Sequence, residues 1–457
     1  MRRFGSLSPE AGDALLYAIA ALFALLTIVT STEALYRQWA ELAIGPFLGG
    51  TVMAVGLEIL RRRSDAKSAT EPTATPATPN TDAAADPLPT PSRRSWTLRI
   101  ALAIGVFAGA TAIPLGLEIL WRSDHDPGTH EQPEVTVIEH AGQAVAKGKD
   151  PYHAVTNRKG KVIYHAPGVS TVNSFDPYLP IMNAFGIPSE KSHNIGLTDA
   201  RIFFSVATLG VAALALFLCA ADARHKMRAL QVIAILPTAA LPLATGGDDM
   251  PVVAFLLLAM VLAQRRQPFL SGIVLGIVSA MKFTAWPLAA LAFFAARNKR
   301  GQRRPDLMLI GLLLVMVPVV VPYVLSGPWA FFDNVVLFPL GLSGVTSPAA
   351  SPLPGHLIVS AFPWLHRALP VTVGFVGGGI LGLYLWKRPP QNVADVCWLG
   401  GIVMAVATLV APATRIGYLL YPINFFVWSY LFSEADVRAP TLGLEDPPRR
   451  QLLTART

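Results

Sequence analysis

FLSGIVLGIVSAMKFTAWPLAALAFFAAR, residues 269–297, is the stretch that decides the fold class of this chain. Its apolar residues are continuous rather than alternating, which excludes a membrane β-barrel and favours helices in lipid. Lys282 divides the stretch into two halves, each shorter than the about 20 residues that a membrane-spanning helix needs. We therefore predict two short helices that meet at Met281, Lys282 and Phe283.

The rest of the chain has the same apolar character. Of its 457 residues, 53% are hydrophobic and 14% are charged, and the mean hydropathy is +0.47. A soluble domain carries about 25% charged residues. Roughly 240 apolar residues, at about 20 per helix, supply roughly twelve membrane spans. This composition excludes a soluble enzyme with a single membrane anchor, and it excludes disorder over most of the chain.

Apolar runs recur along the whole chain. They lie near residues 14–32, 42–60, 97–120, 200–221, 229–245, 250–264, 269–281, 284–297, 307–326, 369–386, 394–411 and 416–433. Several runs are shorter than about 20 residues, so the number of spans carries a margin of one or two. The sequence predicts an all-α, polytopic membrane helix bundle of about 10–12 transmembrane helices with two long outer loops.

The basic residues give the bundle an orientation. If the spans alternate in direction, the basic clusters fall on one side: Arg2-Arg3, Arg61 to Arg63, Arg93-Arg94, Arg224 to Arg228, Arg265-Arg266, Arg297 to Arg304, Lys387-Arg388 and Arg449-Arg450. Lys and Arg are retained on the cytoplasmic side of a membrane. This topology accounts for the net charge of +8 without nucleic-acid binding, since no basic stripe with interleaved aromatic residues is present. We predict a multi-pass protein of the plasma (inner) membrane.

Low-complexity sequence divides the chain into parts. Residues 64–95 are rich in Pro, Thr and Ala and contain too little apolar surface to fold, which predicts a disordered cytoplasmic linker. The linker separates an N-terminal two-helix transmembrane hairpin, residues 1–63, from the main transmembrane domain, residues 96–433. Residues 434–457 are predicted to form a cytoplasmic tail.

Two long segments, residues 121–198 and 327–368, are predicted to face outside, and ordered loops of this length tend to carry function. Within the first, the apolar residues between 133 and 146 have helical spacing. We interpret residues 133–146 as a short amphipathic helix that lies on the membrane surface.

Polar residues that could carry chemistry gather on the same outer side. A charged group at a membrane boundary costs free energy unless water or a partner is near, so such residues indicate a site. The candidates are Glu134, Asp150, Asp176, Asp248, Asp249, Lys282, His356 and Arg415. The alternative is that these residues only cap short helices and solvate turns.

Two of these candidates allow a specific chemical interpretation. Glu134 opens the amphipathic helix, where it is either a cap favoured by the helix dipole or a general base for an acceptor hydroxyl. Lys282 and Arg415 are suited to hold a phosphate or a carboxylate. Asp248 and Asp249 could bind Mg²⁺ or Mn²⁺, but no His or third carboxylate stands at a fixed short spacing, so capping is equally consistent.

A family resemblance rests on two stretches. EVTVIEHAGQAVAKGKDPY, residues 134–152, resembles the first outer loop of the polyprenyl-phosphate-mannose-dependent α-mannosyltransferases, which are actinobacterial membrane enzymes of the GT-C superfamily. The polar turn GGDDMP, residues 246–251, and LSGIVLGIVSAMKFTAWP, residues 270–287, also look like that family. The resemblance covers roughly residues 97–433 and leaves out the N-terminal hairpin and the linker.

The resemblance implies a GT-C bundle whose cavity opens to the outer leaflet, and an inverting transfer of mannose from polyprenyl phosphate to a lipid or glycan acceptor without a metal or cofactor. The catalytic Asp of the family falls on Glu134, which is one methylene longer. The resemblance also implies that the donor phosphate is bound by Lys282, His356 and Arg415. It implies that the sugar or the acceptor is bound by Asp150, Tyr152, Asp176, Asp248 and Asp249.

Two other classes of protein remain open. A transporter or flippase of lipid-linked sugars would use the same cations to hold a phosphate, but it needs a polar path through the membrane, and the predicted spans are almost free of polar residues. A non-catalytic scaffold of envelope assembly would use the same polar residues only to cap helices.

Overall fold

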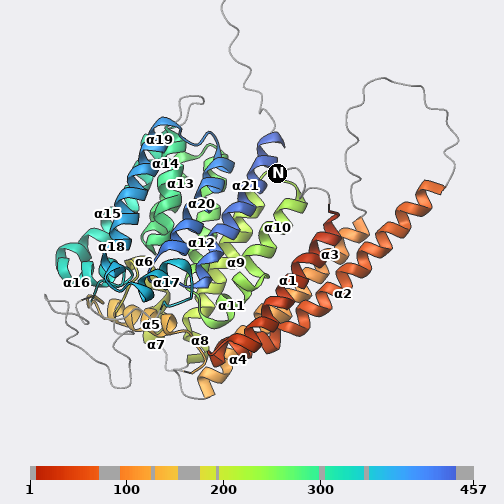
Figure 1. The fold of residues 1–457 in the computed structure, drawn as a ribbon, viewed down its shortest axis with the longest axis horizontal. Coiled ribbons are helices and arrows are strands. Elements are labelled where there is room, and N and C mark those ends of the chain that lie inside the picture. Colours follow the sequence, from red (N-terminus) through yellow and green to blue (C-terminus); the bar gives the residue numbers. More distant parts are fainter. Residues whose placement is uncertain are drawn as a thin grey trace, which may run out of the picture.

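The computed structural model is helical throughout the part of the chain that it describes, which comprises residues 7–70, 93–124, 129–152, 175–191, 195–297, 304–343 and 349–438. Within these ranges β pairing is limited to one isolated bridge between Ala350 and Thr414. The helices form one bundle (Figure 1). The prediction of an all-α, polytopic membrane helix bundle is confirmed.

In the part of the chain that the structure describes, seven helices are long and apolar enough to cross a membrane. They are Pro9–Thr30 (α1), Ala34–Ala66 in α2 (Ala34–Thr70), Arg94–Asp124, Gly196–Leu218, Pro305–Ser326 (α15), Leu365–Lys387 and Val393–Val410 (α20). Three of them join shorter elements: α3 (Arg93–Phe107) with α4 (Ile113–Asp124), α8 (Ile195–Thr198) with α9 (Ala200–Leu218), and α18 (Leu365–Thr372) with α19 (Gly378–Lys387).

The remaining apolar runs are also helical, but they are not among these seven candidates. They are α10 (Ala223–Ala234) and α11 (Pro237–Thr245), which meet at 42°, together with α12 (Asp249–Gln264), α13 (Pro268–Ser279), α14 (Trp286–Ala296) and α21 (Leu420–Arg438). The bent pair raises the number of candidate spans to eight, below the predicted 10–12. The difference arises because α12, α13 and α14 have 16, 12 and 11 residues, each fewer than the about 20 that a membrane-spanning helix needs.

The N-terminal hairpin packs on the bundle rather than standing apart from it. Helices α1 and α2 run beside α3 (Figure 1). Asp13 of α1 is buried, pairs with Arg99 of α3 at 2.7 Å, and also pairs with Arg228 of α10. The predicted linker falls outside the described residues over 71–92, as does the predicted tail from residue 439 onward.

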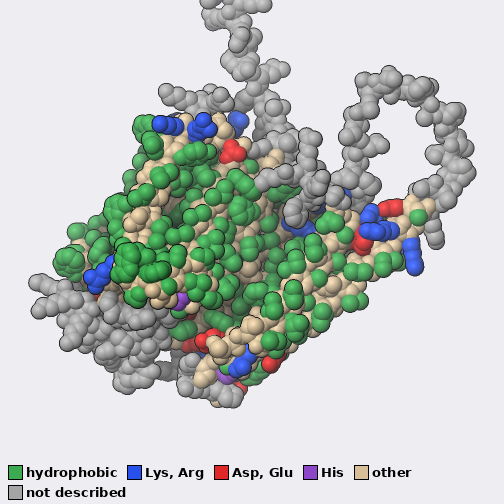
Figure 2. All heavy atoms as spheres, viewed as in Figure 1, with side chains coloured by type: hydrophobic (Ala, Val, Ile, Leu, Met, Phe, Trp, Pro, Cys, Tyr) green, Lys and Arg blue, Asp and Glu red, His purple; other side chains and the backbone are tan. Residues whose placement is uncertain are grey.

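The outer-loop segments form short helices at one end of the bundle, which we call the α5 end (Figure 1). They are α5 (Pro133–Ala146), α6 (Pro180–Asn183), α7 (Pro188–Lys191), α16 (Pro328–Phe332) and α17 (Pro354–Ala361). Apolar side chains cover the sides of the bundle, and several Lys and Arg side chains lie at the end opposite α5, as Figure 2 shows.

Helix α5 matches the predicted amphipathic helix, but protein covers its apolar face. Val135 and Ile138 are fully buried. A Cβ atom on Gly142 would lie 2.2 Å from the carbonyl carbon of Gly186, so the two backbones cross at a distance that only glycine permits. Helix α5 is therefore a fixed part of the fold, and this packing replaces the interpretation that it lies on the membrane surface.

Candidate functional site

Glu134 and Arg415 meet at the α5 end although 281 residues separate them. Glu134 stands in the first turn of α5, and Arg415 precedes a 3₁₀ turn, Ile416–Leu419, that leads into α21. Arg415 Nη1 donates to Glu134 Oε1, and the Glu134 carboxylate raises the pKa of Arg415. The second oxygen, Glu134 Oε2, is buried and has no hydrogen-bond partner among the residues that the structure describes. One carboxylate oxygen is therefore available to a ligand.

Lys282 joins the two neighbouring aspartates. Its Nζ lies 2.8 Å from Asp248 Oδ2 and 2.8 Å from Asp249 Oδ1. The predicted break at Lys282 explains this geometry, because its backbone is extended between α13 and a 3₁₀ turn, whereas the two aspartates begin α12. The ammonium lies where a divalent cation bridging the two carboxylates would have to sit. Among the described residues, the aspartates therefore bind Lys282 rather than offering an open metal site.

The two ion-paired groups belong to one site. Backbone N–H of Gln132 donates to Thr245 O at 2.8 Å, and the Gln132 side chain donates to Thr245 Oγ1 at 2.6 Å. These bonds hold the start of α5 against the turn that leads to Asp248. Burial raises the pKa of Asp248 to about 7; the charges of Asp249 and Glu134 act in the same direction, and Lys282 opposes them. We call Glu134, Asp248, Asp249, Lys282 and Arg415 the five-residue site.

Four tyrosines surround this site, and no sequence pattern singled them out. The rings of Tyr178 and Tyr418 lie 5.4 Å and 5.8 Å from Lys282 Nζ, within cation–π range. Tyr421 donates to Asp249 Oδ1. Tyr36, from the N-terminal hairpin, interacts electrostatically with both Glu134 and Arg415. The hairpin therefore reaches the site, although the family resemblance does not include it.

Asp150, Tyr152 and Asp176 form a second, supporting group. Asp176 is buried and accepts from Asn183 Nδ2 at 2.7 Å, and burial raises the pKa of Asp176 to about 7. Tyr152 donates to the carbonyl oxygen of Tyr178 at 2.8 Å, and Asp150 accepts from the Tyr152 backbone N–H at 2.9 Å. Their contacts hold the loop that presents the Tyr178 ring to Lys282, so the structure brings them close to the five-residue site without placing them in it.

His356 stands at the start of α17. Its Nδ1 lies 3.2 Å from the carbonyl oxygen of Pro412, three residues before Arg415. The adjacent Gly355 is packed so tightly that an added Cβ would lie 2.1 Å from the Val410 carbonyl oxygen. The described contacts of His356 therefore connect α17 to the segment that carries Arg415.

Residues 195–412 match the model of glycosyltransferase family 87. The match supports a membrane glycosyltransferase. It covers a little less than half of the chain and includes Asp248, Asp249, Lys282 and His356, whereas Glu134 and Arg415 lie outside it. No curated protein and no solved structure matches the chain.

A buried ionic cluster around Arg122, which the sequence did not predict, lies beside α5. The Arg122 guanidinium lies 2.7 Å from Glu131 Oε2, 2.7 Å from Glu139 Oε2 and 2.8 Å from Asp199 Oδ2. The three carboxylates are close enough together to hold a metal ion, but the guanidinium contacts all three. The cluster ties α5 to α4 and to the start of α9, and so fixes the helix that carries Glu134.

The cluster makes stability depend on pH. Burial raises the pKa of Glu131 from its usual 4.5 to about 8, so the folded state holds a proton that the unfolded chain releases. Stability is therefore expected to fall as pH rises from about 5 to 8. We expect the apparent Tm of purified protein to drop by about 5 °C across this window, and Glu131→Gln to remove most of the drop.

The matched control is Glu190→Gln, which alters a glutamate paired with Lys147 at 2.8 Å on the surface. This variant should keep the wild-type pH profile. A Glu131→Gln protein whose Tm still falls between pH 5 and 8 as in the wild type would contradict the assignment of the buried proton to Glu131.

Proposed function

We propose that this chain is a GT-C-type glycosyltransferase that transfers a mannose-like sugar from a polyprenyl-phosphate donor to a hydroxyl of a lipid or glycan acceptor, with inversion at the anomeric carbon. One observation carries the proposal: Glu134 presents a buried carboxylate oxygen without a described partner in the same site as two cations, Lys282 and Arg415. We assign the transferase to residues 96–433, with residues 1–63 as an added hairpin.

The five-residue site can supply the base and the charge stabilisation that this reaction needs. Glu134 Oε2 accepts the proton of the acceptor hydroxyl as the hydroxyl oxygen attacks the anomeric carbon. The bond between that carbon and the phosphate oxygen breaks, and polyprenyl phosphate leaves with the electron pair. Lys282 and Arg415 stabilise the charge that develops on the leaving phosphate. Attack on the face opposite the leaving group converts a β-linked donor into an α-linked product.

In this mechanism, binding of the donor would separate Glu134 from Arg415. The donor phosphate is a diester with one negative charge, and like a carboxylate it can bind guanidinium through two parallel hydrogen bonds. Donor phosphate therefore competes with Glu134 for Arg415. Once Arg415 turns to the phosphate, both oxygens of Glu134 face the acceptor, so the base is released only when the donor is present.

The distribution of charge supports action at the outer face of the plasma membrane. Lys and Arg side chains lie at the end of the bundle opposite α5 (Figure 2), and such residues are retained on the cytoplasmic side. The α5 end, which holds the five-residue site, then faces outward. A polyprenyl-phosphate sugar presented in the outer leaflet would reach this end from within the membrane.

Membrane vesicles of defined orientation test the proposed function. We expect right-side-out vesicles to transfer labelled mannose from externally added polyprenyl-phosphate mannose to a new product, and sealed inside-out vesicles to do so only after they are permeabilised. Label that crosses the bilayer without forming a product would replace the transferase with a flippase. Transfer from polyprenyl-phosphate glucose but not from the mannose donor would keep the reaction type and correct the sugar.

A further inference from the structure

The Lys282 ammonium keeps one N–H group for a ligand. An ammonium has three N–H groups, and its nitrogen here lies 2.8 Å from Asp248 Oδ2 and 2.8 Å from Asp249 Oδ1. The rings of Tyr178 and Tyr418 flank the same nitrogen, and no third oxygen accepts from it among the residues that the structure describes. Because the three N–H groups stand at fixed angles, the positions of the two aspartates decide where the third one points.

Asp249 is the fixed member of this pair. Within the described contacts, the side chain of Asp248 accepts only from Lys282. Asp249 Oδ1 also accepts from Tyr421 Oη at 2.5 Å, and Tyr421 Oη in turn lies 2.5 Å from Thr284 Oγ1. An ionised carboxylate has no proton to give, so Tyr421 donates to Asp249 and its oxygen is left to accept from Thr284. The Thr284 hydroxyl therefore acts on Asp249 through Tyr421.

These contacts form a closed ring that begins and ends in one turn. Asp249 begins α12, Tyr421 is fully buried in the first turn of α21, and Thr284 belongs to the 3₁₀ turn Phe283–Ala285 that directly follows Lys282. With the ion pair alone, the long Lys282 side chain would follow Asp249 as that carboxylate rotates. The ring prevents this rotation. We call Thr284, Tyr421, Asp249 and Lys282 the Tyr421 network.

We propose that Thr284 and Tyr421 are positioning residues for the sugar transfer, which direct the remaining N–H group of Lys282 at the phosphate of the donor. The inference rests on the proposed function and deepens it. Without the hydrogen bond from Tyr421, Asp249 would rotate about its side-chain bonds and move Lys282 with it. A misplacement of about 1 Å can lower a rate by about 10²-fold. The loss should therefore appear in the rate at saturating donor as well as in donor binding.

Equilibrium binding of decaprenyl phosphate to the purified full-length protein tests this role, together with the initial rate of mannose transfer at saturating donor. Thr284→Val keeps the shape of the side chain without its hydroxyl. We expect this variant to weaken binding about fivefold and to lower the rate about tenfold. Tyr421→Phe should have at least the same effects. Thr284→Ser, which restores the hydroxyl, should return both quantities to within about twofold of the wild type.

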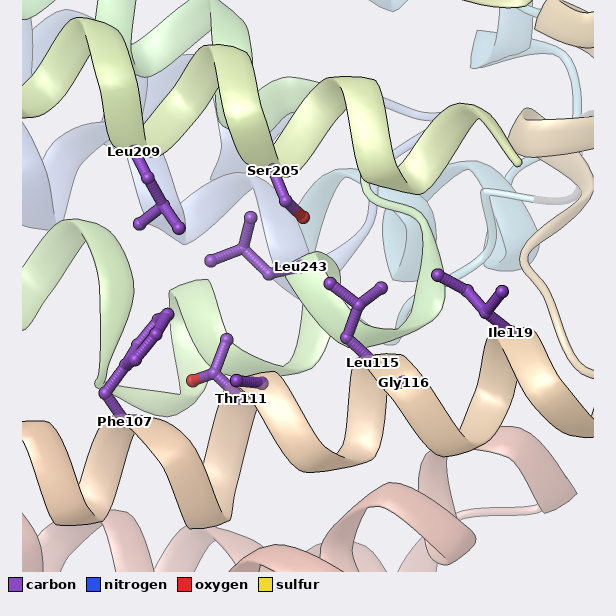
Figure 3. A pocket seen from close by; sticks show the side chains of 9 residues that line it. Phe107, Thr111, Leu115, Gly116, Ile119, Ser205, Leu209 and Leu243 are labelled. Carbon is purple, nitrogen blue, oxygen red and sulfur yellow. The ribbon is translucent and has the colours of Figure 1, made fainter. Parts of the chain in front are cut away.

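Thr111→Val is the matched control. The same substitution there removes a hydrogen bond from Thr111 Oγ1 to Ala234 O, at 3.0 Å, in the wall of an apolar groove that has no described contact with the Tyr421 network (Figure 3). This variant should bind decaprenyl phosphate and transfer mannose as the wild type does. A loss in Thr111→Val equal to that in Thr284→Val would reduce the effect to one of stability and overturn the proposal.

A double-mutant cycle decides whether the hydroxyls act through Lys282. In a protein that carries Lys282→Met and Asp248→Asn, adding Thr284→Val should weaken the binding of decaprenyl phosphate no further. Equal weakening by Thr284→Val in this background and in the wild type would overturn the positioning role. Wild-type binding and transfer by both Thr284→Val and Tyr421→Phe would overturn it too, and either outcome would leave the proposed function standing. A wild type that binds no decaprenyl phosphate would instead overturn the proposed donor, and the positioning role with it.

Discussion

Glu134→Gln is expected to lower sugar transfer by about 10²–10⁴-fold, the usual contribution of a general base. The amide has nearly the size of the carboxylate, and its oxygen can still accept from Arg415, so the fold should persist. What the amide lacks is the ability to take a proton from the acceptor hydroxyl. The measurement is the initial rate of mannose transfer at saturating polyprenyl-phosphate mannose, with apparent Tm recorded on the same preparations.

Two further variants make this result specific. Glu134→Asp keeps the acid but withdraws it by one methylene, so we expect it to retain a measurable part of the activity. Glu190→Gln changes a surface glutamate on the same outer loop and should transfer sugar at the wild-type rate. If Glu134→Gln transfers sugar as fast as the wild type at equal expression, Glu134 is not the base.

The positions of the helices were predictable, because they depend on which stretches of the chain are apolar enough to lie in lipid. Each of the twelve apolar runs is helical, because a backbone in lipid must satisfy its own hydrogen bonds. The break at Lys282 was also predictable, since a cation in a long apolar run needs a partner. The number of full-length spans was not predictable, because α12 to α14 are short helices that other helices cover. Which helices are covered in this way depends on the packing of the folded chain.

The candidate site was predictable in its residue types but not in its pairing. Sequence indicated that Glu134 and Arg415 share one side of the membrane, yet only the folded chain shows that they bind each other. The Arg122 cluster left a usable signal, because Arg122 directly ends an apolar run, and a cation at a membrane boundary needs a partner. The tyrosines left none, since an aromatic residue at a membrane boundary is common in any span.

Lys282→Met is expected to cause the largest combined loss, because it leaves Asp248 and Asp249 buried without their cation. Removing one partner of a buried ion pair lowers the free energy of unfolding by about 3–5 kcal/mol, and the donor phosphate loses a cation as well. The activity of this single variant therefore cannot separate a loss of stability from the loss of a cation at the donor phosphate. The informative protein is the double variant Lys282→Met with Asp248→Asn, which removes one charge of each sign and should recover most of the apparent Tm.

The comparison that decides the role of Lys282 is between the double variant and Asp248→Asn alone. If Lys282 stabilises the leaving phosphate, the double variant should transfer sugar about 10²-fold more slowly than Asp248→Asn, despite a similar Tm, because electrostatic stabilisation of a developing anion is lost. Binding of decaprenyl phosphate should weaken in parallel. If Lys282 only neutralises the aspartates, restoring the charge balance restores the rate, and the two variants transfer sugar equally. The ion pair that the structure shows is compatible with either role, but the rate of the double variant is compatible with only one.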